Sequence, residues 1–230
     1  MRCQEYLHEI GNHPFGKAVI LHYLAGLHAM RDDFAAAQAT LDSAKSLLDT
    51  LGAPITASTT QPAALIAMLA GDPATAEEHL RLEYDFLCRM GERRYLPTTA
   101  VKLARVIAAQ GQDRYDEAIH LIATVRDAAA GEDLVTQALS QGVLARMLAD
   151  RGLHREAEDL ARSAAALAAQ TDLLSERAGI QLDLAHVLAA LGRVTEAHAA
   201  TAHAIDLYQR KGNLPGIRES LRHLAHYAPV

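Results

Sequence analysis

The 230-residue chain has a net charge of −6, with 22 Lys and Arg against 28 Asp and Glu, and half of its residues are hydrophobic. This balance lacks the clustered basic footprint that phosphate backbones require, so we expect no nucleic acid binding by this segment alone. The two cysteines, Cys3 and Cys88, form no CxxC pair, which favours a reduced, cytoplasmic setting. No apolar run reaches the ~18 residues of a membrane helix and no signal-peptide core follows Met1, so we predict no membrane contact.

A two-helix pattern recurs five times along the chain. Each copy has a Leu-Ala or Ala-Ala pair, a turn usually led by Gly or Asp, and an alanine that opens a second apolar helical face. Successive opening alanines are separated by 39, 42, 39 and 40 residues: Ala37, Ala76, Ala118, Ala157 and Ala197. A two-helix repeat of this length is typical of an α-solenoid, in which each hairpin buries its apolar face by stacking on its neighbours. We therefore predict an all-α superhelix of about five helix-turn-helix repeats with a capping helix.

The repeats divide the chain into three predicted segments in one continuous body. Residues 1–15 resemble the tail of a truncated repeat helix and its turn, and an unpaired apolar helix there predicts a weak homodimer through this end. Residues 16–213 hold the five repeats, of which the second is weakest because Glu83 stands at an apolar position. Residues 214–230 form a C-terminal cap. In that cap the expected apolar face carries Ile217, Leu221 and Leu224, and the opposite face carries Arg218, Glu219 and Arg222.

The turns between paired helices carry a family resemblance. Tyr115-Asp116-Glu117-Ala118, His154-Arg155-Glu156-Ala157 and Val194-Thr195-Glu196-Ala197 resemble the Gly-x-aromatic-x-Glu-Ala turn of tetratricopeptide (TPR) repeats. The period exceeds the 34 residues usual for that family. The longer period, with the stretches 185–192 and 207–213, is similar to the C-terminal arrays of bacterial multidomain nucleotide-cyclase/ATPase or transcription-activator signalling proteins. The resemblance implies a non-catalytic protein-interaction or regulatory scaffold.

In TPR arrays the residue after the first small position of each repeat lines the concave groove. Here these aligned positions are Gly26, Leu65, Arg105, Arg146 and His186, and we call the last three the basic ladder. Lys102 is expected one position around from Arg105. Arg binds carboxylate or phosphate bidentately, so the basic ladder predicts an acidic peptide or partner domain in the groove. The open alternative is that Asp150 and Asp183 neutralise the ladder through salt links between repeats.

Four further side chains complete the predicted groove surface: His22, Tyr23, Met68 and Asp150. An alternative function is a small-ligand sensor arm of a bacterial signalling or transcription regulator. That alternative predicts a closed pocket lined by Tyr23, Met68 and Arg105.

The spacing of residues in the sequence predicts no catalytic, cofactor or metal site. There is no Cys-His or Ser-His-Asp arrangement that suggests a nucleophile, so we predict that the chain is not an enzyme. Gly11 to Lys17 has the spacing of a phosphate-binding loop, but Ala18 stands where Ser or Thr is needed, so no nucleotide cofactor is predicted. His223 and His226 could share a metal with His198 or His203, but ordinary surface histidines are preferred because structural zinc needs four ligands.

Overall fold

The computed structural model describes residues 14–50, 52, 55–129 and 133–227, with the side chains of 55–59 and 125–129 left out of the description. The predicted truncated helix tail and dimer surface before residue 14 fall almost entirely outside these residues. Cys3 and most of the phosphate-loop-like segment do so as well.

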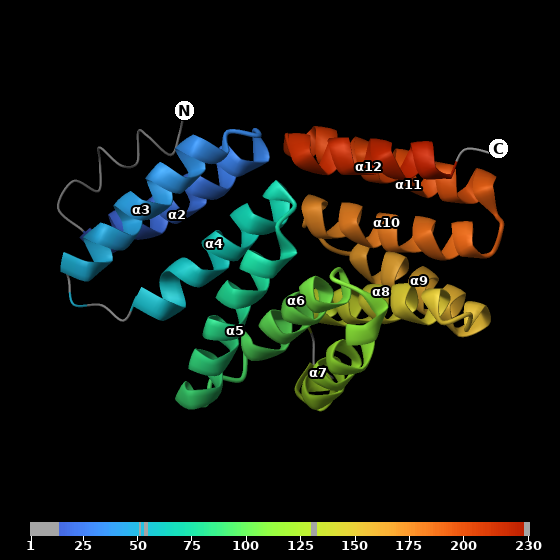
Figure 1. The fold of residues 1–230 in the computed structure, drawn as a ribbon, viewed down its shortest axis with the longest axis horizontal. Coiled ribbons are helices and arrows are strands. Elements are labelled where there is room, and N and C mark those ends of the chain that lie inside the picture. Colours follow the sequence, from blue (N-terminus) through green and yellow to red (C-terminus); the bar gives the residue numbers. More distant parts are fainter. Residues whose placement is uncertain (1–13, 51, 53–54, 130–132, 228–230) are drawn as a thin grey trace. The chain divides into compact units, whose positions relative to one another are not determined.

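Eleven α-helices and one 3-10 turn, with no strand, make up the described part of the chain (Figure 1). The first helices of the five repeats are α2 (Pro14–Met30), α4 (Ile55–Ala70), α6 (Leu96–Ala108), α8 (Leu134–Asp150) and α10 (Leu174–Ala190). The second helices are α3 (Phe34–Thr50), α5 (Pro73–Met90), α7 (Tyr115–Ala129), α9 (His154–Ala168) and α11 (Val194–Lys211). The capping helix is α12 (Leu214–His226). The prediction of five helix-turn-helix repeats and a cap is confirmed.

Small residues bring the two helices of each repeat together. The five alanines that mark the repeat period are each the fourth residue of a second helix, and each is 0% exposed. Their counterparts on the first helices are also buried: Ala25, Ala64, Ala104, Ala145 and Ala185. A methyl side chain lets two helix backbones approach closely and lets their side-chain ridges interlock. The helices consequently pack as pairs, α2 with α3 through to α10 with α11.

Left-handed residues end the helices where the sequence predicts turns. Gly91 closes α5 at φ 65° and Gly212 closes α11 at φ 76°, conformations that glycine adopts without steric cost. In the first repeat Asp32 stands where later repeats have glycine, and it takes the left-handed conformation itself at φ 67°. The 42-residue interval before Ala118 contains the added 3-10 turn η1 (Gln112–Arg114).

The chain forms two compact units with a boundary that the repeat period does not mark. The first unit, Met1–Glu92, contains the first two repeats, and the second unit, Arg93–Val230, contains the other three and the cap. The core of the first unit includes Ala25, Ala37 and Leu41, which pack with Ile66. In the second unit the first helices follow one another, with α6 against α8 and α8 against α10, while α12 packs on α11.

The second repeat buries the acid that makes it the weakest in sequence. Glu83 on α5 is 2% exposed, and it accepts a hydrogen bond from the side-chain amide of Gln61 on α4. The hydrogen bond compensates part of the cost of burying a polar group between paired helices. The deviation at Glu83 is therefore accommodated within the same helical pair.

The buried face of the cap differs from the predicted one at a single leucine. Leu221 was expected on the buried side, but it is 53% exposed. Ile217 packs on a core cluster as predicted. The cap also buries Pro215, Gly216, Ser220 and Tyr227. A Cβ atom on Gly216 would lie 2.8 Å from the ring of Tyr208, so the helix approaches this aromatic ring through a residue without a side chain. Close packing on one large ring outweighs the leucine pattern.

Candidate partner-binding groove

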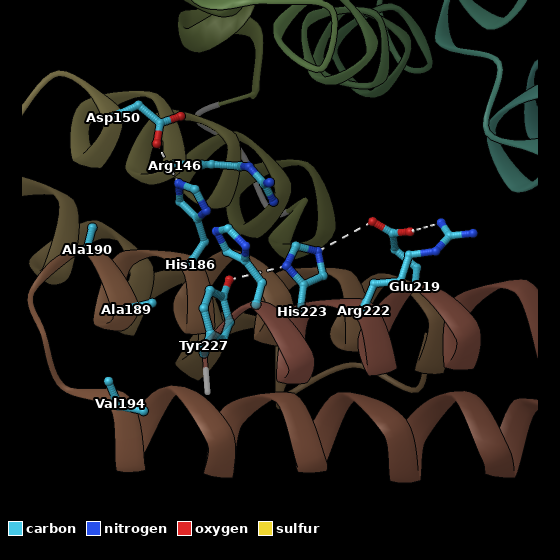
Figure 2. Close-up of a pocket in the computed structure, with 11 residues that line it drawn as sticks. Arg146, Asp150, His186, Ala189, Ala190, Val194, Glu219, Arg222, His223 and Tyr227 are labelled. Atoms are coloured by element: carbon cyan, nitrogen blue, oxygen red, sulfur yellow. Dashed lines mark hydrogen bonds and ion pairs between the residues drawn. The ribbon is translucent and has the colours of Figure 1, made fainter. Parts of the chain in front are cut away.

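The second unit contains an open groove of about 740 Å³ where α8, α10 and α12 meet (Figure 2). Three polar groups from these helices surround its centre: Arg146 from α8, His186 from α10 and His223 from α12. The other lining residues are Asp150, Ala189, Ala190, Val194, Glu219, Arg222, His226 and Tyr227.

Arg105, the first residue of the basic ladder along the chain, forms an ion pair with a buried acid. Asp183 on α10 is 1% exposed and accepts two hydrogen bonds from the Arg105 guanidinium on α6, at 3.1 and 2.6 Å. Burial alone would lower the pKa of Arg105, but the charge of Asp183 and its hydrogen bonds outweigh that effect and raise the pKa. The Arg105–Asp183 ion pair therefore joins the third repeat to the fifth.

A glycine on the intervening helix leaves room for this ion pair. Gly142 lies in the middle of α8, and a Cβ atom there would be 2.7 Å from a carboxylate oxygen of Asp183. Any larger residue would push the carboxylate away from its present position. Gly142 therefore permits Arg105 and Asp183 to meet beside the fourth repeat.

Arg146 forms only a long ion pair with the same acid, Asp183. Its guanidinium is 3.8 Å from Asp183, and the side chain is 37% exposed where it lines the groove. Because Asp183 already accepts two shorter hydrogen bonds from Arg105, it satisfies little of the donor capacity of Arg146. The arginine that lines the groove therefore retains N–H groups for a ligand.

The third ladder residue, His186, is fixed by the last residue of α8. Its Nε2 lies 2.5 Å from a carboxylate oxygen of Asp150, whose other oxygen accepts a hydrogen bond from the hydroxyl of Tyr115. Burial lowers the pKa of His186, and the positive charge of Arg146 lowers it further, against the opposing effect of Asp150. For the Tyr115 hydroxyl on the other oxygen of Asp150, burial and this hydrogen bond raise the pKa to about 12. The imidazole is thus held in place and kept largely neutral at neutral pH.

The cap contributes the opposite wall of the groove. The hydroxyl of Tyr227 lies 3.2 Å from Nδ1 of His223, and Nε2 of His223 lies 3.5 Å from Glu219 (Figure 2). Glu219 also accepts a 2.7 Å hydrogen bond from Arg222. Burial lowers the pKa of His223, as does Arg146, while Glu219 opposes the shift. Acids and bases of the cap therefore meet those of α8 across one groove.

One end of the groove is apolar and the rest is polar. Ala189, Ala190 and Val194 lie together at one side, with the ring of Tyr227 nearby (Figure 2). Two lining arginines balance two lining acids, so the sign of the local charge depends on whether the three lining histidines carry protons. The groove can accept a small apolar group beside an anionic one.

The remaining predicted groove residues are not among those that line this groove. Lys102 is half-buried on α6. His22, Tyr23 and Met68 belong to the first unit, where Tyr23 is 70% exposed and Met68 38% exposed. The predicted closed pocket required Tyr23 and Met68 together with Arg105, which already binds Asp183 in the second unit.

Sequence reasoning missed the part of the groove that α12 supplies. Leu224-Ala225-His226 repeats Leu184-Ala185-His186 at an interval of 40 residues, so the repeat signal extends into the cap. The interval could have placed His226, and with it His223 one turn earlier, among the groove residues. In the sequence Tyr115 belongs only to a turn motif, and no sequence signal marks its bond to Asp150.

Two kinds of feature are absent from the residues that the structure describes. In the part of the chain that the structure describes, no three His, Cys, Asp or Glu side chains gather in a way that could hold a metal ion. Over the same residues, none of the helices has the length and apolar character needed to cross a membrane.

Comparisons with solved structures show the same architecture. The apo form of the quorum sensor NprR from B. thuringiensis aligns with a TM-score of 0.62 and 14% identity, covering 98% of this chain and 64% of that one. The nearly identical TPR-like repeats described for a kinesin light chain of Podosopora anserina align with a TM-score of 0.55 and 18% identity, covering 87% and 98%. BtubC (BKLC) from P. vanneervenii aligns with a TM-score of 0.57 and 16% identity, covering 91% and 87%.

No protein-family profile matches the sequence, and no curated protein matches it significantly. At these identities the structural alignments establish the fold alone. The chain is a TPR-like helical repeat array, as its turns and alanine period indicate.

Proposed function

We propose that the chain is a non-catalytic interaction module whose second unit binds an acidic segment of a protein partner in the groove lined by α8, α10 and α12. One observation carries the proposal: Arg146 lines the groove with only a 3.8 Å ion pair to an acid that Arg105 already occupies. A carboxylate that enters the groove can accept the hydrogen bonds that Arg146 does not make to Asp183.

The apolar end of the groove refines the partner's chemistry. Ala189, Ala190 and Val194 offer a shallow surface for a small aliphatic side chain next to the bound carboxylate. The open shape suits an extended peptide better than an enclosed metabolite, which favours a peptide over the small-ligand alternative. A reduced, cytoplasmic setting belongs to the same proposal, because Cys88 is a free and exposed thiol.

The test is the affinity of a fluorescein-labelled Glu-Ala repeat peptide, measured by fluorescence anisotropy at low salt. The Arg146→Gln variant removes the charge at the centre of the groove. Since a hydrogen bond to a charged group contributes about 1.5–3 kcal/mol, the dissociation constant should rise by about tenfold or more.

Two controls give this result its meaning. Arg155→Gln removes the same charge from an exposed position on α9, outside the groove, and should leave the affinity nearly unchanged. A Gln-Ala repeat peptide of equal length should bind weakly or not at all. Equal losses in the Arg146 and Arg155 variants, or equal binding of the two peptides, would contradict the proposal.

A further inference from the structure

We infer that anion binding in this groove requires uptake of one proton by His186, so that the groove binds acidic ligands tightly only when the pH falls. This inference rests on the proposed function, and it assigns a regulation to the same site. The bond to Asp150 orients the His186 ring.

The tautomer of His186 follows from its partner. An ionised carboxylate can only accept hydrogen bonds, and Asp150 accepts one from Tyr115 on its other oxygen. Nε2 of the neutral His186 ring must therefore carry the hydrogen, which leaves a lone pair on Nδ1. In Figure 2 the second nitrogen of the ring faces the groove, on the side where Arg146 lies. A neutral His186 consequently presents an acceptor to any anion that binds Arg146, and the two acceptors repel.

Protonation reverses that interaction. With a hydrogen on Nδ1, His186 becomes a donor on both nitrogens and can hold the anion together with Arg146 while it keeps its bond to Asp150. The bound anion in turn offsets the field of Arg146, which is one cause of the lowered pKa of His186. Binding therefore raises the pKa of the imidazole, and proton uptake and anion binding favour each other.

Charged and titratable groups face the groove from α8, α10 and α12. On α8 they are Arg146 and Asp150, and on α10 Asp183 adds a negative charge that Arg105 of α6 already pairs with. The cap contributes Glu219, Arg222, His223, His226 and Tyr227, and α11 contributes the uncharged Val194. Glu219 opposes anion entry, but it is half exposed and already bonded to Arg222, so it can remain at the rim. Among the groove histidines, His186 is bonded to a carboxylate, Asp150, that Tyr115 also holds in place. This carboxylate sets the tautomer of His186.

Linkage determines the direction and size of the effect. The pKa of His186 lies below its usual value in the free protein and rises on binding. The added affinity is therefore complete below the free-state pKa and is lost as the pH rises through the bound-state pKa. Between these two values, uptake of one proton changes the dissociation constant about tenfold for each pH unit.

The experiment measures binding of the Glu-Ala repeat peptide to the full chain from about pH 5.5 to pH 8, where the glutamates of the peptide remain ionised. The expected result is a dissociation constant that rises up to about tenfold per pH unit in the wild type. His186→Asn, whose amide does not titrate, should flatten this dependence. His120→Asn changes an exposed histidine on α7 and should retain it.

A second measurement needs no variant. Calorimetric titration of the wild type near neutral pH, in two buffers that differ in ionisation enthalpy, should reveal uptake of about one proton per bound peptide. Binding that depends on Arg146 but takes up no proton and does not change with pH would overturn this inference and leave the proposed function intact. Equal pH dependence in the wild type and His186→Asn would overturn it as well. Absence of peptide binding at every pH would instead contradict the proposed function.

Discussion

The two units carry the same repeat but place opposite chemistry at the aligned groove positions. In the first unit these positions hold Gly26 and Leu65, whereas in the second they hold Arg105, Arg146 and His186. The surroundings follow the same division. Exposed apolar side chains near the first two are Tyr23, Leu27 and Met68, while acids accompany the other three.

One helical register can therefore support two ways of joining neighbouring repeats. In the first unit a Cβ atom on Gly26 would lie 3.4 Å from the end of the Leu65 side chain, so the contact between α2 and α4 is apolar. In the second unit Asp183 and Asp150 bond to residues of other repeats through charged and polar groups. Apolar contacts are tolerant of small changes, whereas a buried polar network depends on each of its members.

The largest expected effect comes from removing the acid at the centre of the second unit. Asp183→Ala leaves the guanidinium of Arg105, which is 25% exposed, without its carboxylate. Breaking a buried ion pair by deleting one partner costs about 3–5 kcal/mol of unfolding free energy. Urea denaturation measures the loss, and hydrogen exchange should locate it in residues 96–227 rather than in the first unit.

Asp206→Ala serves as the matched control for this variant. Its carboxylate pairs with Arg210 at 3.6 Å, and both side chains are more than half exposed. Exposed pairs of this kind contribute about 0–1 kcal/mol. If Asp183→Ala cost no more than Asp206→Ala, the contrast between the units would lose its energetic basis.

A smaller effect, of opposite sign in the two units, is expected from one type of substitution at two helical glycines. Gly142→Ala in the second unit brings a methyl group to 2.7 Å from the Asp183 carboxylate, and overpacking of this kind costs about 1–3 kcal/mol. Gly26→Ala in the first unit meets only the flexible end of Leu65 at 3.4 Å. There the gain in helix propensity should stabilise the protein by about 0.5–1 kcal/mol.

Thermal or urea denaturation of the two variants measures this pair of effects. A stabilising Gly142→Ala would show that the Asp183 carboxylate moves at little cost. The ion pair would then constrain the second unit less than its geometry indicates.

The smallest expected effect is a loss of stability in both units as the pH falls. Burial lowers the pKa values of His22 and His79 in the first unit and of His186 and His223 in the second. Histidines in the unfolded state titrate near ~6.5, so the unfolded state takes up protons before the folded state as the pH decreases. The free energy of unfolding therefore decreases as the pH falls below ~6.5. Their combined effect is largest at the folded-state pKa values and below.

Urea denaturation at about pH 7.5 and about pH 5.5 measures the loss, and a bound acidic peptide distinguishes the units. The Glu-Ala repeat peptide stabilises the form that binds it, so at the lower pH it should restore protection from hydrogen exchange in residues 134–227. Residues 14–50 should gain none directly from it. Equal recovery in both regions would remove the functional distinction between the units.

Much of the fold could be predicted from the spacing of small residues. Ala37, Ala118 and Ala197 each mark the first turn of a second helix, because only a small side chain permits close helix contact at that point. The sequence places the cap and most of its buried face correctly, but not Leu221. The Leu221 pattern is local, while the packing of Gly216 on Tyr208 depends on a helix that ends before the cap begins.

The candidate groove was predictable only in part. Register alone brought Arg105, Arg146 and His186 to equivalent positions, and Asp150 and Asp183 were foreseen as acids that could pair with them. Register could not show that Asp183 binds Arg105 through two short hydrogen bonds and Arg146 at 3.8 Å. That asymmetry depends on the space beside Gly142, which a repeat alignment does not contain.

The helical repeat, its turns and the residues that share a helix face can be read from the sequence, because they follow from local periodicity and backbone preference. Which charges meet depends on how the helices pack. Arg105 and Asp183 are 78 residues apart in sequence, and the residues that line the groove come from four helices. Electrostatic interactions depend on distance in space and on burial, and only the packed second unit sets both.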